Sequence, residues 1–307
     1  MILHRVLVMP LVILLITFVA FCLLHLAPSD PTIVALRVHD IELTPEVIAL
    51  TRTELGLDKP FLYRYWLWLW RILHLDFGHS FITHQPVLDE LAHALPTTLY
   101  LAFGALLLII IVAVGLSCLS MFVLHSWGDK LMRGVLFFFT AMPNYWLALL
   151  LIWSFAVQLK WFPVSGLQQT SGLILPAITL ALGYIGTYFR LMQGTMIQQL
   201  KQPYAQYIKA RGLSYKRLIF RHILPNSLHN LFTGMGMSIP KLLAGAVVIE
   251  NIFALNGIGR LCIQAIFSRD YPVIQGYILL MALLFLSFNF LNDVLQQWLD
   301  PRLRGAK

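Results

Sequence analysis

Long apolar stretches, each able to cross a bilayer as a helix, occupy most of this chain. A helix needs about 20 residues to cross roughly 30 Å of hydrocarbon. Six stretches satisfy this length, near residues 6–27, 98–124, 134–158, 173–196, 228–249 and 273–299. Because the 307 residues are 59% hydrophobic and only 12% charged, a soluble globular domain of ordinary composition is excluded. The sequence predicts an all-α integral membrane protein with six transmembrane helices.

The limits of these stretches predict how the chain is organised. Residues 1–27 form a tail and the first helix, because their apolar run exceeds the roughly 7–15 residues of a signal-peptide core and no cleavage motif follows. Residues 28–97 are polar and too long for a simple turn, so we expect an extracytoplasmic cap. Residues 98–299 hold five helices, with a cytoplasmic loop at 197–226, and residues 300–307 form a tail.

The distribution of cations predicts the orientation in the membrane, since Lys and Arg are held on the cytoplasmic side during insertion. Placing Arg5, residues 125–133, residues 190–226 and the C-terminal tail inside gathers most of the 22 Lys and Arg residues there. Both termini are then cytoplasmic. The net charge of +8 is a property of the inner face, and no nucleic-acid partner is expected.

Within the cap, two helices are expected. Thr44 with Pro45 and Glu46 is typical of a helix start, and Gly56 of its end. The run FLYRYWLWLWRILHL predicts a second helix, whose Trp and Tyr side chains suit the headgroup level of a membrane.

Five histidines in the cap raise the question of a metal site, because imidazole suits nickel. They are His39, His74, His79, His84 and His93. The spacing of His74, His79 and His84 fits neither one helix face nor one strand face, so no metal ligand is assigned. Three scattered cysteines, Cys22, Cys118 and Cys262, are read as small core residues. No catalytic or phosphate-binding motif occurs, so neither a catalytic residue nor a cofactor is assigned to this chain.

The longest polar segment between apolar stretches, residues 201–226, reads as helix, elbow, helix. Pro203 opens the first helix, and Gly212 ends it in the left-handed conformation. Ser214 caps the second helix, which Pro225 is expected to stop. The segment carries several cations and no acid. Its amphipathicity fits either a hairpin resting on anionic lipid or a docking surface for another protein.

This segment resembles the cytoplasmic loop of ABC importer permeases, in which coupling helices sit in a groove of an ATPase subunit. The likeness lies in Tyr204, in the run 209–213 and in the run 222–226. It implies ATPase contacts from Tyr204, Lys209, Ala210, Arg211, Gly212, Leu213, Ser214 and Arg217. Gln206, Tyr207 and Ile208 stand where the broader signature has Glu, Ala and Ala, so no contact that needs the glutamate is inferred.

Further motifs extend the resemblance over nearly the whole chain. LGLDKP, LDFGHSF, QPV and LPTTL follow in the order seen in dipeptide, oligopeptide and nickel permeases, and DPR closes the last helix. HLDFG, ENIFALNGIGR and FSRDYPVIQ are most similar to the nickel-type B permease.

The resemblance implies the type I ABC importer permease fold in a bacterial inner membrane. Expected partners are a second and different permease, two cytoplasmic ATPases that bind ATP and Mg, an extracytoplasmic substrate-binding protein and lipid. The implied cargo is nickel or another transition metal, as such or as a small organic chelate (a metallophore), with short peptides as the alternative. The implied mechanism is alternating access.

Charged residues inside the predicted spans are candidates for the transport path, because each costs about 2.5–3.5 kcal/mol to insert. Lys241 and Asp293 either neutralise each other, or Lys241 faces the path and attracts an anionic cargo. Glu250, at the mouth of the outer loop 250–272, and Asn289 are further candidates.

Proline and glycine residues predict helix bends and close packing. Pro143 is expected to bend the third span. Small residues in the fourth and fifth spans are expected to let helices approach closely. They are Gly183, Gly186, Gly194, Gly234, Gly236 and Gly245.

Two functions of other classes stay open. One is a secondary transporter driven by an ion gradient, with Lys241 and Asp293 as its relay. Such carriers tend to have internal repeats with matching broken helices, and no such symmetry is visible in the sequence. The other is a membrane scaffold without transport.

Overall fold

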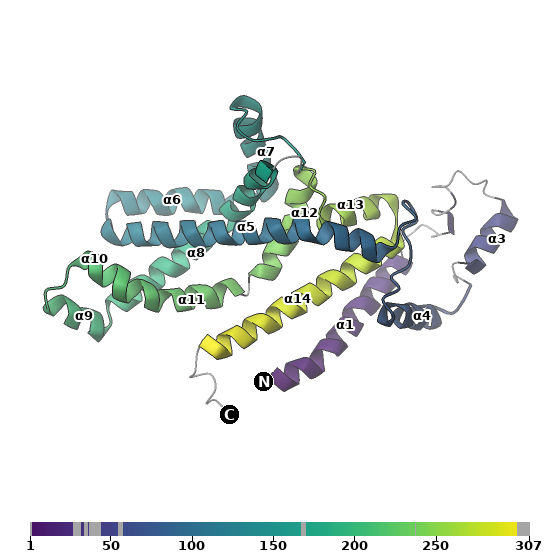
Figure 1. The fold of residues 1–307 in the computed structure, drawn as a ribbon, viewed down its shortest axis with the longest axis horizontal. Coiled ribbons are helices and arrows are strands. Elements are labelled where there is room, and N and C mark those ends of the chain that lie inside the picture. Colours follow the sequence, from purple (N-terminus) through teal and green to yellow (C-terminus); the bar gives the residue numbers. More distant parts are fainter. Residues whose placement is uncertain are drawn as a thin grey trace. The chain divides into compact units, whose positions relative to one another are not determined.

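The computed structural model describes residues 2–26, 32–33, 36, 44–54, 58–166, 170–236 and 238–299, and the named elements within these ranges are all helical (Figure 1). They are α1 (Ile2–His25), α3 (Pro45–Glu54), α4 (Phe61–Leu73), α5 (Val87–Phe122), α6 (Trp127–Ala141), α7 (Asn144–Leu151), η1 (Ile152–Gln158), η2 (Thr170–Leu173), α8 (Ile174–Leu200), α9 (Pro203–Ala210), α10 (Tyr215–Leu218), η3 (Ile219–Ile223), α11 (Leu224–Gly236), α12 (Ile239–Ile252), α13 (Ile258–Ser268) and α14 (Tyr271–Leu299).

The chain forms two compact units. The first comprises the described residues of 1–96 and 257–287, and the second those of 97–256 and 288–307. Both units therefore contain segments that lie far apart in the sequence.

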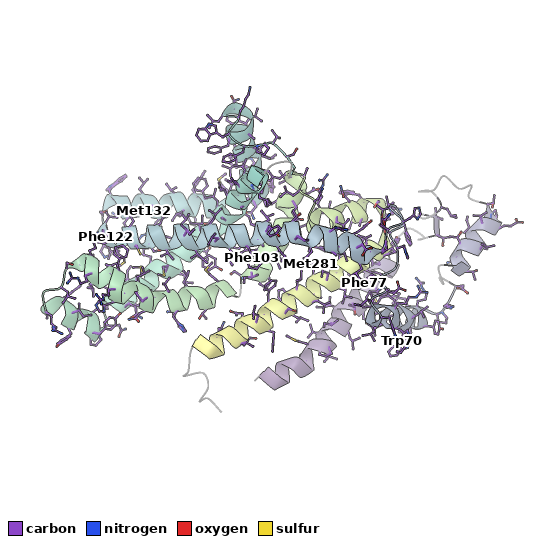
Figure 2. All side chains as sticks on the ribbon, viewed as in Figure 1. Trp70, Phe77, Phe103, Phe122, Met132 and Met281 are labelled. Atoms are coloured by element: carbon purple, nitrogen blue, oxygen red, sulfur yellow. The ribbon has the colours of Figure 1, made fainter. Side chains whose placement is uncertain are left out.

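Aromatic packing joins α1 to α4 in the first unit. The rings of Phe18 and Phe21 lie 5.2 and 5.5 Å from that of Tyr65, and the Thr17 and Tyr65 hydroxyls lie 3.0 Å apart. The predicted second cap helix is thus confirmed as α4, and one of its faces packs on α1 rather than meeting solvent or lipid. Trp66 and Trp70, on its other faces, are 63% and 56% exposed. Trp70 lies on α4 in Figure 2.

The rest of the first unit has its own core. Val87 and Leu91 of α5 pack with residues of α13 and α14, and Ser80 donates a 2.5 Å hydrogen bond to the buried carboxylate of Asp270. The predicted helix start at Thr44 is confirmed, because α3 begins at Pro45 and the Thr44 hydroxyl accepts from the backbone N–H of Val47. The predicted end at Gly56 lies outside the described residues.

Helices long and apolar enough to cross a membrane are found at Val87–Phe122, Ile174–Leu200 and Tyr271–Val294. Among the described residues, two bent pairs raise this number to five if each pair is one span, and the apolar part of α1 is a shorter helix, Val8–Leu24. The exact six predicted spans and the cytoplasmic placement of both termini therefore stay predictions.

Two of the predicted spans differ from the observed helices. The second begins at Val87, eleven residues before the predicted start, because Pro96 is accommodated inside α5. The third is not one helix: α6 and the segment Asn144–Gln158 are bent by 105°. The prediction of a bend at Pro143 is confirmed, since Pro143 is the N-cap of α7 and has no N–H to continue the preceding helix.

Helix α8 is central to the second unit, where it packs against α6, α7, α11 and α12. Phe189, Met192 and Met196 are fully buried on it. A Cβ added at Gly186 would lie 2.2 Å from the Thr140 hydroxyl oxygen, and one at Gly183 would lie 2.6 Å from Asn144 Oδ1. Close packing is confirmed at these glycines and at Gly234, Gly236 and Gly245. It is wrong for Gly194, which has nothing within 4 Å.

Candidate functional site

The basic segment forms the predicted helix and elbow. Helix α9 starts at Pro203 with Gln202 as its N-cap and ends at Ala210. Gly212 follows with φ of +76°, the left-handed conformation that the sequence predicts. A Cβ at Gly212 would meet nothing within 4 Å. The requirement for glycine is therefore set by the backbone and not by space. We call residues 203–217 the docking elbow.

The helix after the elbow differs from the prediction in two respects. Ser214 occupies the N-cap position, but its side chain makes no capping hydrogen bond. Pro225 does not stop the helix: α10 passes through the π-helical turn η3 into α11, which contains Pro225. Proline removes a backbone donor and crowds the carbonyl four residues earlier, and the wider π turn directly before it accommodates that defect.

Buried side chains within the docking elbow and in the turns directly after it anchor its inner face. Ala205, Leu218, Ile219 and Ile223 are fully buried in the core of the second unit. The Tyr204 hydroxyl donates to Gln199 Oε1 at 2.8 Å. These contacts fix the elbow to the helices behind it.

A second anchor comes from Tyr215. Its hydroxyl donates to the backbone carbonyl of Met121 at 3.0 Å, and its ring meets that of Phe122 edge to face, with centroids 5.8 Å apart. Both partners lie in the last turn of α5. The start of α10 is thus fastened to the end of α5.

The outer face of the elbow is cationic and exposed. Exposed residues are Gln206, Tyr207, Lys209, Ala210, Arg211, Gly212, Ser214, Lys216 and Arg217. Residues 197–226 contain no acid, so a partner with carboxylates would meet no repulsion there. The Arg211 guanidinium lies 5.8 Å from the centre of the Tyr207 ring. Of the predicted ATPase contacts, Tyr204 and Leu213 are half-buried and the other six are exposed.

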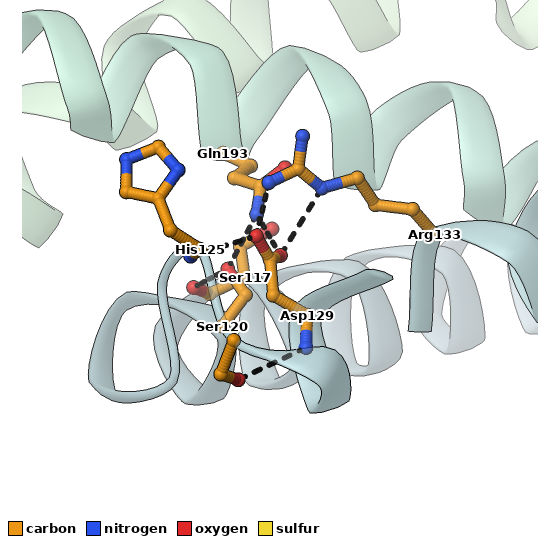
Figure 3. A network of polar contacts seen from close by, with 7 residues as sticks. Ser117, Ser120, His125, Asp129, Arg133 and Gln193 are labelled. Carbon is orange, nitrogen blue, oxygen red and sulfur yellow. Dashed lines mark hydrogen bonds and ion pairs between the residues drawn. The ribbon is translucent and has the colours of Figure 1, made fainter. Parts of the chain in front are cut away.

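A buried polar network lies among the helices that hold the elbow (Figure 3). Asp129, in the first turn of α6, is fully buried and forms an ion pair with Arg133. Gln193 of α8 donates to Asp129 Oδ1 at 2.8 Å and to the Ser120 hydroxyl at 3.0 Å. Sequence reasoning missed this network. Its only local signal is Ser126, whose side chain accepts from the Asp129 N–H as a helix cap, followed by Arg133 one turn after Asp129.

The four path candidates have different surroundings. Lys241, on α12, is exposed and makes no ion pair with any residue that the structure describes. The pairing with Asp293 that the sequence allows is therefore not formed. Glu250 is fully buried and accepts a 2.6 Å hydrogen bond from Thr98. Asn289 and Asp293 are half-buried on α14. Lys241 and Glu250 are separated by about 13 Å along α12, so they do not form one cluster.

Among the described residues, which include four of the five cap histidines, no group of three His, Cys, Asp or Glu side chains is placed to hold an ion. His74 Nδ1 lies 2.9 Å from the carbonyl of Trp70, a hydrogen-bonding role. His39 and the closing residues 300–302 lie outside the described residues.

Comparison with known proteins gives two family matches. Residues 105–305 match the model described as "Binding-protein-dependent transport system inner membrane component", and residues 1–102 match the corresponding N-terminal model. Together they cover almost all of the chain.

Individual relatives agree with these matches. The chain is 36% identical to the metal-staphylopine import system permease protein CntB of Staphylococcus aureus (strain Mu50 / ATCC 700699), over 100% of this chain and 99% of the relative. It is 31% identical to the glutathione transport system permease protein GsiC of Escherichia coli (strain K12), over 94% of each.

The fold is similar to that of a solved chain described as an inward-facing conformation of the MetNI methionine ABC transporter. The TM-score is 0.53 at 17% identity, covering 70% of this chain and 94% of that chain.

Proposed function

We propose that this chain, which belongs to the family of binding-protein-dependent transport system inner membrane components, forms the path for a transition-metal chelate in an ATP-driven importer. It is a permease subunit of an ABC importer in a bacterial inner membrane. This is not a family of enzymes, so transport and not catalysis is the activity to account for.

The docking elbow is the proposed contact with the ATPase subunits. One observation carries this proposal: an exposed, acid-free cationic face is backed by side chains that are fully buried. A partner that binds Lys209, Arg211 and Arg217 can therefore pull on the helices behind the elbow without first unfolding it. Binding through charge complementarity also gives fast and selective association.

The family supports the following proposal for the other subunits. A substrate-binding protein delivers cargo at the outer face, this chain and a second, different permease form the path, and two ATPases bind ATP and Mg. ATP-driven closure of the ATPases displaces the docking elbow, and access alternates between the two sides of the membrane.

The proposed cargo is nickel or another transition metal, carried as a small organic chelate. The likeness to the metal-staphylopine permease over the whole chain supports it. The exposed ammonium group of Lys241 supports it as well, because a chelate rich in carboxylates is anionic. Short peptides are the second candidate, supported by the likeness to the glutathione permease, since glutathione is a tripeptide.

Transport by the reconstituted complex tests both the proposed ATP-driven import and the proposed cargo. Proteoliposomes holding this chain with its co-purifying partners are given ⁶³Ni²⁺ alone, ⁶³Ni-staphylopine or labelled glutathione, with ion gradients collapsed. We expect ATP-dependent uptake of the nickel chelate. Preferential uptake of glutathione would replace the metal cargo with peptides.

Two other outcomes would contradict the importer itself. Uptake that needs an ion gradient and ignores ATP would favour a secondary transporter. Failure of Lys209 and Lys216 to cross-link to any ATP-hydrolysing protein in the native membrane would remove the proposed role of the elbow.

A further inference from the structure

A buried carboxylate organises the turn between α5 and α6. Asp129 has no exposed surface, and its two oxygens accept four hydrogen bonds. Oδ1 accepts from Arg133 Nε at 3.1 Å and from Gln193 Nε2 at 2.8 Å. Oδ2 accepts from the second nitrogen of the same guanidinium and from the backbone N–H of His125 at 3.3 Å. The charge is therefore well solvated by the protein itself.

One side-chain amide extends this network from α6 to α5. The Gln193 amide nitrogen, on α8, also donates to the Ser120 hydroxyl at 3.0 Å. Ser120 donates to the carbonyl of Ser117 at 2.8 Å, and Ser117 donates to the carbonyl of Phe189 on α8 at 3.3 Å. All of these side chains except that of Arg133 are buried. Gln193 thus links hydrogen-bonding groups of α5 and α6 to α8 (Figure 3).

Two of the connections between the docking elbow and the rest of the second unit lead to this network. On one side, Met121, which accepts the hydrogen bond from Tyr215, directly follows Ser120. On the other side, α8 carries Gln193 two turns before it ends at Leu200, and α9 begins three residues later. A displacement of the elbow therefore reaches Ser120 and Gln193 before it reaches α6.

A satisfied buried network holds one geometry more strictly than apolar packing does. Apolar contacts have no required direction, whereas a buried carboxylate that loses a hydrogen-bond donor is left with an uncompensated desolvation cost. The contact of Gln193 with Asp129 thus resists being stretched when α8 moves. Helix α6 is expected to move with α8.

We propose that Gln193 and Asp129 are positioning residues that pass the displacement of the docking elbow to α6. This inference rests on the proposed function, because it needs an ATPase that moves the elbow. The elbow is then connected to α6 as well. The connection runs through the end of α5 and through α8 to the first turn of α6.

The test reads the movement of α6 directly and needs no knowledge of the cargo. A cysteine is introduced by Val135→Cys, at an exposed position of α6, in the complete complex with its ATPases. Its maleimide labelling rate is measured with ATP and without nucleotide, and the parent complex without this cysteine gives the background. ATP hydrolysis is measured on the same samples.

Gln193→Leu removes the amide and leaves the ion pair of Asp129 with Arg133 in place. We expect ATP hydrolysis to persist, while the ATP-dependent change in labelling falls by about fivefold or more, the lower end of ordinary coupling between sites. The matched control is Thr195→Val. It removes a buried hydroxyl of α8 that, among the described residues, bonds only to the carbonyl of Leu191 on the same helix, and it should keep the full change.

An exchange variant keeps the test decisive if Gln193→Leu is poorly folded. Asp129→Asn combined with Gln193→Glu puts the carboxylate on α8 and the amide on α6, so the contact between them is kept. We expect Asp129→Asn alone to reduce the ATP-dependent change and the combination to restore it.

Each result decides a different question. The inference is overturned by an unchanged ATP-dependent response in Gln193→Leu. It is also overturned if the complex that carries only Val135→Cys hydrolyses ATP without any change in labelling. A wild-type complex in which no co-purifying protein hydrolyses ATP overturns the proposed function instead.

Discussion

The hydroxyl of Tyr215 donates a 3.0 Å hydrogen bond to the backbone carbonyl of Met121. This bond joins the first residue of α10 to the last turn of α5 across 94 positions of the sequence. It stands at the base of the docking elbow, where the cationic outer face gives way to the buried core. The elbow is therefore anchored on α5, although α6, α7, η1, η2 and α8 lie between the two in the chain.

Tyr215→Phe should weaken this anchor selectively. The ring contact with Phe122 remains, and the Met121 carbonyl loses its partner, a loss of about 1 kcal/mol. We expect a slightly lower thermal unfolding temperature of the purified complex and less ATP hydrolysis in response to the loaded binding protein. Tyr100→Phe, at an exposed position of α5 outside the elbow, is the control and should change neither. Equal behaviour of the two variants would contradict the role of the bond.

Gly212→Ala should strain the elbow without a steric clash. The left-handed conformation is unfavourable for alanine by roughly 1 kcal/mol, whereas a Cβ there meets open space. We expect weaker co-purification of the ATPase, with Gly212→Asn intermediate because asparagine tolerates this conformation. Gly194→Ala is the control, since Gly194 is helical and also faces open space. Loss of binding in both alanine variants would mean that the conformation of Gly212 is not what matters.

Gly236→Ala should destabilise the contact between α11 and α14. The added Cβ would lie 1.6 Å from Oδ1 of the buried Asn292, and such overpacking costs about 1–3 kcal/mol. Removing the obstacle with Asn292→Ala should recover part of the loss. Thermal unfolding of the two single variants and the double variant measures the effect. Strictly additive losses would show that the two residues do not compete for the same space.

Lys241→Met should slow transport while leaving the fold intact, because the side chain is exposed and makes no ion pair with the described residues. For an anionic chelate, we expect a higher KM in proteoliposome uptake and an unchanged unfolding temperature. Lys241→Arg keeps the charge and should transport nearly normally. If the Met variant transports as well as the wild type, Lys241 does not attract the cargo.

The sequence predicted those features of the elbow that depend on local chemistry. Pro203 and Gly212 act through their own backbone angles, so their effects were readable without any knowledge of tertiary structure. Pro225 was misread as a stop, because whether a proline ends a helix depends on how the turn before it adjusts. That adjustment, η3, leaves no mark in hydrophobic periodicity.

The network around Asp129 could not be predicted for a different reason. Asp129 and Gln193 are 64 residues apart, and each alone looks ordinary: an acid in a first helical turn and an amide on an amphipathic helix. Only their burial on facing helices makes them a unit. The same holds for the bend of 105° after α6. The proline predicted that the helix would bend, but the direction of the following helix could not be predicted from the sequence.

The π-helical turn at Ile219–Ile223 fixes how the elbow is rotated about the axis of α10 and α11. Compared with an α-helix, such a turn holds one extra residue, which advances everything beyond it by about 100°. Deleting a single residue there would restore regular α-helical geometry. It would also rotate the cationic face about the helix axis by more than a quarter of a turn. The same five residues therefore determine the direction in which the cationic face of the elbow points.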